Sequence, residues 1–163
     1  MAEMMNPALE GATLLFPQGS FITAYAYTGV EDEIKAYQTS AWIGTALMTS
    51  PIYDVYGPDA VKLMGQVCTN DFTTLGMNGI RHAVMCNEKG QILTDGVVIR
   101  IGEDRYRTDW LAPVISYYVN TSDLDVHCEN MSGKEYFIQI DGEKSLEFLE
   151  NAFQANLHDI KFG

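Results

Sequence analysis

The segment YDVYGPDAVKLMGQV, residues 53–67, contains an alternating apolar run, then a glycine, then apolar residues at helical spacing. A second segment, IQIDGEKSLEFLENA at residues 138–152, repeats this strand-glycine-helix pattern. Gly57 and Gly142 occupy the same place in the two segments, and the positions that follow them correspond as pairs: Ala60 with Ser145, Leu63 with Phe148, and Met64 with Leu149. The pattern predicts duplicated strand-helix units in which each glycine opens an equivalent helix.

The residues between the two segments favour hairpins. Three β-rich runs, at 79–86, 91–101 and 104–110, are separated by the short turn signals NEKG at 87–90 and Gly102-Glu103. Strands joined by such short turns pair antiparallel, so the expected fold class is α+β with antiparallel sheet. We expect an N-terminal arm and a first helix over residues 1–49, and one α+β domain over residues 50–163.

Composition and charge exclude several classes of function. The chain has 163 residues and a net charge of −12, and its basic residues are too few and too scattered for nucleic-acid binding. No apolar run approaches membrane-spanning length, and the first residues do not resemble a signal peptide. Three widely spaced cysteines and three histidines lack the spacing of a metal site, and the thiols are typical of a reduced, cytoplasmic protein.

Asp95 is the residue in this sequence that calls for an explanation. It is the only charge in the apolar run GQILTDG at residues 90–96 and is followed by Gly96. Asp-Gly between two apolar runs is a strong hairpin signal, because both residues tolerate positive φ. A turn here would leave a very short strand after NEKG, so a single strand with a kink or bulge at Asp95–Gly96 also fits. Periodicity alone favours neither interpretation: Asp95 is a turn residue, or it is a functional carboxylate presented by a strand.

Four motifs in order resemble one known family. They are GPDA at 57–60, TND at 69–71, NEKG at 87–90 followed by Asp95, and FIQIDGEKSLEFLE at 137–150. Residues 50–153 are thereby similar to the folate-binding aminomethyltransferases, typified by the T-protein of the glycine cleavage system. The resemblance implies that Asp95 is the catalytic carboxylate beside the pterin of tetrahydrofolate. It also implies that Val97, Ile99 and His82 contact the folate, His82 standing where the family has a tyrosine.

Other positions depart from the T-protein pattern. Thr94 replaces the first of two adjacent aspartates, Leu111 replaces an asparagine, and TALMTS at 45–50 replaces an Asp-x-Ser-His segment. Gly96 and Ala112-Pro113 look more like the tetrahydrofolate-dependent O-demethylases of methoxylated aromatic acids. The resemblance therefore implies one-carbon transfer between tetrahydrofolate and a small-molecule methyl or aminomethyl donor, without nucleic-acid or membrane partners.

Members of this family are at least twice as long as this chain. We therefore expect a fragment whose bare apolar surface promotes self-association. One alternative is a non-catalytic folate-binding accessory protein, like the iron-sulfur-assembly relatives of this family. Another is an α+β domain in which Asp95 only shapes a bulge.

Overall fold

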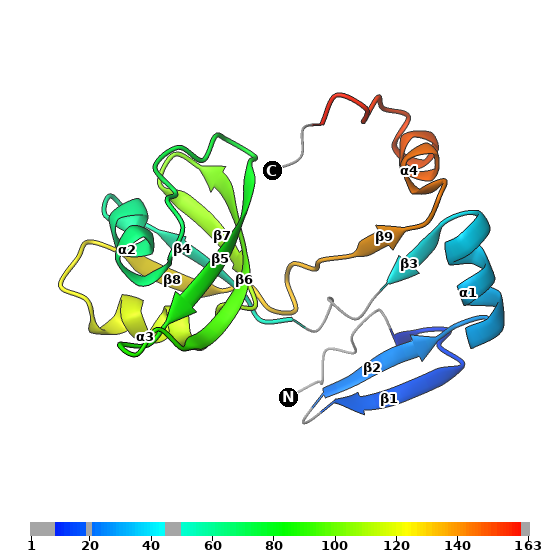
Figure 1. Cartoon of the computed structure of the whole chain (residues 1–163), viewed down its shortest axis with the longest axis horizontal. Coiled ribbons are helices and arrows are strands. Elements are labelled where there is room, and N and C mark those ends of the chain that lie inside the picture. Colours follow the sequence, from blue (N-terminus) through cyan, green and yellow to red (C-terminus); the bar gives the residue numbers. More distant parts are fainter. Residues whose placement is uncertain (1–8, 19–20, 45–49, 161–163) are drawn as a thin grey trace. The chain divides into compact units, whose positions relative to one another are not determined.

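The computed structural model describes residues 9–18, 21–44 and 50–160. The chain divides into two compact units (Figure 1). Unit 1 combines residues 1–49 with residues 136–162, and unit 2 is residues 50–135. The sequence analysis placed residues 136–163 with the second domain, whereas their contacts group residues 136–162 with the N-terminal segment.

The elements follow one another in a mixed order. They are β1 (Leu14–Gln18), β2 (Phe21–Ala26), α1 (Val30–Thr39), β3 (Trp42–Gly44), β4 (Ile52–Tyr56), α2 (Ala60–Val67), β5 (Ile80–Cys86), β6 (Ile92–Gly102), β7 (Arg105–Asp109), α3 (Val114–Thr121), β8 (His127–Asn130), β9 (Gln139–Asp141) and α4 (Ser145–Phe153). The segment interpreted as an N-terminal arm contains the β1–β2 hairpin. Every pair of these strands that forms a sheet in the described residues is antiparallel.

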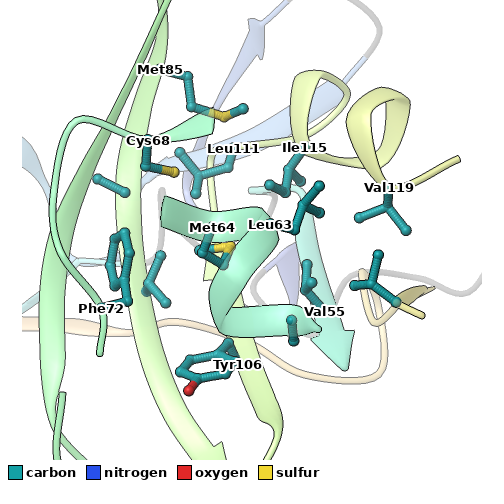
Figure 2. Packing of buried hydrophobic residues seen from close by; sticks show 14 of the residues in the cluster. Val55, Leu63, Met64, Cys68, Phe72, Met85, Tyr106, Leu111, Ile115 and Val119 are labelled. Carbon is teal, nitrogen blue, oxygen red and sulfur yellow. The ribbon is translucent and has the colours of Figure 1, made fainter. Parts of the chain in front are cut away.

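Unit 2 is a five-stranded sheet with two helices on one face. Its strand order is β5-β6-β7-β4-β8. Figure 2 shows side chains of α2 and α3 packing against side chains from the sheet, and this cluster includes Val55, Leu63, Met64, Met85, Tyr106, Ile115 and Val119. Burying each large side chain of this kind contributes about 1.5–3 kcal/mol. Unit 2 therefore has a closed hydrophobic core of its own.

Unit 1 is built from smaller pieces. The β1–β2 hairpin and the β3–β9 pair are two separate two-stranded sheets, and α1 and α4 accompany them (Figure 1). Neither helix has a buried residue. Unit 1 therefore lacks the closed core that characterises unit 2.

The duplication expected from the sequence is present in the backbone. Gly57 follows β4 with φ 126°, and Gly142 follows β9 with φ 118°. A Cβ on Gly57 would lie 2.6 Å from the carbonyl oxygen of Asp125, and one on Gly142 would lie 2.5 Å from that of Ser40. Only glycine fits both the positive φ and the close backbone approach. The fold-class prediction of α+β units with antiparallel sheet is confirmed.

The helices begin at the positions that the sequence paired, Ala60 and Ser145. In each unit the amide two residues after the glycine donates to the carbonyl that the glycine approaches: Asp59 to Asp125 at 3.2 Å, and Lys144 to Ser40 at 2.8 Å. Gly57 is not the N-cap of α2, because Asp59 occupies that position. Gly57 instead ends the strand and turns the chain toward the helix.

Candidate functional site on the open face of the unit 2 sheet

Asp95 lies inside a continuous strand. β6 runs from Ile92 to Gly102 without a turn, so the hairpin reading of Asp95–Gly96 is wrong. The pairing with β5 is regular at both residues, and the register shift falls just before Thr94. The bulge is therefore next to Asp95 rather than at it. Gly96 serves a different purpose: a Cβ there would lie 2.0 Å from the carbonyl oxygen of Asp109, so only glycine lets β7 approach so closely.

The strand register brings the four predicted site residues together. Val98 of β6, with Ala83 and Met85 of β5, is buried in the core under the helices. Because successive side chains of a strand point to opposite faces, the intervening residues lie on the face away from that core. His82 is directly opposite Val97 in the β5–β6 pairing. We call the set His82, Asp95, Val97 and Ile99 the Asp95 strip.

His82 and Asp95 form the polar part of the Asp95 strip. His82 Nε2 lies 3.1 Å from Asp95 Oδ2, although the residues are on neighbouring strands and 13 positions apart. This hydrogen bond forms with the histidine tautomer that carries a proton on Nε2, which then donates to the carboxylate oxygen. The side chains are 58% and 62% exposed. Both groups are accessible to a ligand, and water screens the carboxylate until something covers the strip.

Thr94 and Leu111, the two departures beside the strip, do not belong to it. The Thr94 hydroxyl donates to the carbonyl oxygen of Trp110 at 2.8 Å. Trp110 has a φ of 66°, which is uncommon for a residue other than glycine. Leu111 is fully buried in the helix-side core, so it cannot contact a ligand on the strip. Thr94 therefore fixes the backbone at Trp110, the residue that follows β7.

The structure adds Asp109 to this face of the sheet. Asp109 is opposite Val97 in the β6–β7 pairing and only 3% exposed. Burial raises the pKa of its carboxyl, although hydrogen bonds from Ser50 and the Trp110 amide act in the opposite direction. Its Oδ1 has no hydrogen-bond partner among the described residues. The sequence held a signal for this placement, because Arg105, Arg107 and Asp109 are charged at every second position of a strand.

A second buried carboxylate, Asp54, has a contrasting environment. It is fully buried and accepts hydrogen bonds from Arg107 Nε at 2.8 Å and Arg105 Nε at 2.9 Å. Burial alone would raise the pKa of Asp54, but the hydrogen bonds and charges of Arg107 and Arg105 hold it below its usual value. This pair of arginines also binds Glu129 and Glu135. Their charges are compensated within the fold.

The other two arginines of unit 2, Arg81 and Arg100, are also hydrogen-bonded within the fold. Arg100 donates to the carbonyl oxygens of Leu75 and Glu103, and Arg81 donates to Asp71 and Thr74. The TND motif at 69–71 closes the loop after α2: the Thr69 amide donates to Val84, and Asp71 accepts from Thr73. This motif therefore holds together the junction between the helix and the loop that follows it.

The described residues contain no group of three or more His, Cys, Asp or Glu side chains arranged to hold a metal ion. Burial raises the pKa of the Cys68 thiol to about 12, which leaves it unreactive. No helix in the described ranges is both long enough and apolar enough to cross a bilayer. The Asp95 strip itself presents a carboxylate, an imidazole and two apolar side chains.

Comparison with known proteins identifies the class of this chain. Residues 10–163 match the family model described as the GCVT N-terminal domain, and the chain belongs to this family. It is similar to the sesamin methylene transferase of Sinomonas sp. (strain No.22), with 52% identity over 156 residues that cover 94% of this chain and 34% of the relative. It is also similar to an aminomethyltransferase of Thermotoga maritima, with 28% identity over 83% of this chain and 38% of the relative.

A solved structure supports the fold independently. The glycine cleavage system aminomethyltransferase T of Bartonella henselae matches with a TM-score of 0.75 and 18% identity, over 88% of this chain and 40% of that protein. At this identity the match concerns the fold alone. The chain spans about a third of the length of the curated relatives, 34% and 38% for the two named above.

Proposed function

We propose that this chain is the N-terminal part of a tetrahydrofolate-dependent one-carbon transferase. The observation that carries the proposal is the Asp95 strip, where strand register places an accessible carboxylate and an imidazole beside the apolar side chains of Val97 and Ile99. Membership of the GCVT N-terminal domain family and the names of the two relatives favour a transferase over an iron-sulfur accessory protein.

The donor set of the Asp95 strip fits tetrahydrofolate. A flat ring with N–H donors needs an apolar surface and a carboxylate at its edge, and Val97, Ile99 and Asp95 provide these on one face of the sheet. Tetrahydrofolate would supply the nitrogen that accepts or gives up the one-carbon unit. Asp95 would orient that amine and stabilise positive charge that develops on it, and His82 would fix the position of the carboxylate through the 3.1 Å hydrogen bond.

The donor is proposed to be a small methoxylated or methylene-bridged aromatic compound. The relative named sesamin methylene transferase shares 52% of aligned residues, whereas the Thermotoga maritima aminomethyltransferase shares 28%. Gly96, with its close backbone contact to Asp109, was one of the features that pointed to this branch. We also propose a cytoplasmic location, from the reduced character of the cysteines.

The test replaces Asp95 by Asn in a chimera, in which residues 10–163 substitute for the matching segment of the sesamin methylene transferase. Asn keeps the size and the hydrogen bond but removes the charge, so turnover should fall by about 100-fold while folding is preserved. Asp104→Asn is the control, because Asp104 is exposed and lies in the turn after β6. Methyl or methylene transfer to tetrahydrofolate is measured together with thermal stability.

A second measurement addresses the chain by itself. Calorimetric titration of the 163-residue protein with tetrahydrofolate should give saturable binding that Asp95→Asn weakens and Asp104→Asn does not. Unchanged turnover in the Asp95→Asn chimera would show that the carboxylate is structural, and the proposed role of the strip would then be wrong.

A further inference from the structure

Trp110, the residue that follows β7, has a backbone conformation that is unfavourable for a large side chain. Its φ of 66° lies in the left-handed region, where a bulky residue is an outlier. The other described non-glycine residues with positive φ are Asn78 in a turn and Gln154 at the end of α4, and the left-handed conformation is common at both kinds of position. Trp110 instead lies at the end of a strand, so the surrounding structure must hold it in this conformation.

Hydrogen bonds from three segments hold the backbone of Trp110. The Thr94 hydroxyl donates to its carbonyl oxygen at 2.8 Å. Its amide donates to the carbonyl oxygen of Pro51 at 3.2 Å and to the carboxyl group of Asp109. Asp109 is itself buried, and its Oδ1 has no partner among the described residues. Two unfavourable features therefore occur at adjacent residues, and such features cluster at ligand-binding sites.

The left-handed conformation decides on which face of the sheet the neighbouring side chains lie. In a regular strand, residues 109 and 111 would share a face. Here Asp109 is opposite Val97 on the open face, whereas Leu111 lies in the helix-side core. The side chain of Trp110 is 41% exposed and does not belong to that core. The backbone is therefore constrained in a way that leaves the indole accessible.

Trp110 is next to the Asp95 strip. Its hydrogen bond with Thr94 joins it to the residue immediately before Asp95. The residue immediately before Trp110 is Asp109, which is directly opposite Val97 of the strip. An indole offers a flat apolar surface and one N–H donor, so it suits an aromatic ring that carries oxygen substituents.

We propose that Trp110 is a specificity-determining residue that stacks on the aromatic ring of the one-carbon donor, and that Thr94 and Asp109 are positioning residues that hold its backbone. The inference rests on the proposed function, because it requires an aromatic donor bound beside the Asp95 strip. Aromatic pairs are favoured beyond the area that they bury, so Trp110 selects aromatic donors over aliphatic ones. Its contribution is to donor binding, while the chemical step depends on Asp95.

The test uses the chimera in which residues 10–163 replace the matching segment of the sesamin methylene transferase, with sesamin as the donor. Trp110→Gly removes the indole and also relieves the strain, because glycine readily adopts positive φ. The KM for sesamin should rise about tenfold, while kcat changes less than about threefold and the dissociation constant of tetrahydrofolate does not change. Trp110→Phe keeps an aromatic ring and should keep the KM within about threefold of the parent value.

A stability measurement separates a binding role from a structural one. In the 163-residue chain, the urea midpoint of unit 2 should be unchanged or higher in Trp110→Gly, since the strained conformation is relieved. Thr94→Val removes the hydroxyl hydrogen bond and should raise the KM for sesamin by a smaller factor than Trp110→Gly does. Tyr117→Ala is the control, because Tyr117 is an exposed aromatic residue of α3, and it should leave the KM unchanged.

The outcomes distinguish this inference from the proposed function. If the parent chimera is active and Asp95→Asn abolishes turnover, but Trp110→Gly leaves the KM for sesamin unchanged, only the role of Trp110 is wrong. The inference is also overturned if Trp110→Gly lowers the urea midpoint and weakens tetrahydrofolate binding, because Trp110 would then be structural. If the parent chimera does not bind tetrahydrofolate, the proposed function is wrong and the inference fails with it.

Discussion

Units 1 and 2 use the same local construction and reach different degrees of packing. Each has a strand that ends at a glycine with positive φ, followed by a helix that starts three residues later. In unit 2 that helix buries Ala60, Leu63 and Met64, whereas the equivalent helix of unit 1 buries no residue. The comparison shows that local sequence determines the turn and the helix, while burial depends on how many neighbours the rest of the chain provides.

The largest expected effect comes from breaking the charge network of unit 2. Asp54→Ala removes the fully buried partner of Arg105 and Arg107, so the free energy of unfolding of unit 2 should fall by about 3–5 kcal/mol. Glu129→Ala removes a half-buried member of the same network whose charge is screened by water, so its effect on stability should be much smaller. Urea denaturation of both variants measures the difference. Equal effects would mean that burial of Asp54 does not set the strength of the network.

An intermediate effect is expected at the two equivalent glycines. Gly57→Ala and Gly142→Ala introduce the same strain, because both glycines have positive φ and both face a carbonyl oxygen. Gly57→Ala should destabilise unit 2 by about 1–3 kcal/mol. Gly142→Ala should leave the unfolding of unit 2 unchanged and accelerate hydrogen exchange only in α4 and the β3–β9 pair. A loss of unit 2 stability in Gly142→Ala would contradict this expectation.

The smallest effect is expected at the buried carboxyl of Asp109. Burial raises the folded-state pKa of Asp109 above the ordinary value of 3.8, so its ionisation opposes folding at pH values above the raised pKa. Below 3.8 both states are protonated and this penalty disappears. Asp109→Asn should therefore stabilise the protein by about 1 kcal/mol at pH 7 and give no gain at pH 3.

The pKa of Asp54 shifts in the opposite direction, so its effect on stability has the opposite dependence on pH. Its pKa is lowered in the folded protein, so its contribution to stability is present above the ordinary value of 3.8 and is lost as the pH falls through the lowered pKa. Urea denaturation at pH 7 and pH 3 distinguishes the two residues. A stabilisation by Asp109→Asn that is the same at both pH values would show that the charge of Asp109 is not the cause.

Part of the candidate site could be predicted from the amino-acid sequence, and part of it could not. The motif resemblance pointed to Asp95, His82, Val97 and Ile99 as site residues, and the strand register places these side chains on one face. Periodicity could not separate a turn from a strand at Asp95–Gly96, because the reason for Gly96 is the close approach of Asp109 from another strand. The roles of Arg105 and Arg107 could not be read from the sequence for the same reason, since their partner Asp54 is about 50 residues away in sequence.

The sequence by itself determined the local features: the two glycine turns, the starts of the helices that follow them and the antiparallel class of the sheets. These depend on φ preferences and on apolar spacing within a few residues. Only the tertiary structure decided the strand order, the grouping of residues 136–162 with the N-terminal segment, the His82–Asp95 contact and the unpaired oxygen of Asp109. The physical reason is that each of these depends on contacts between segments far apart in the chain, which no local pattern of residues encodes.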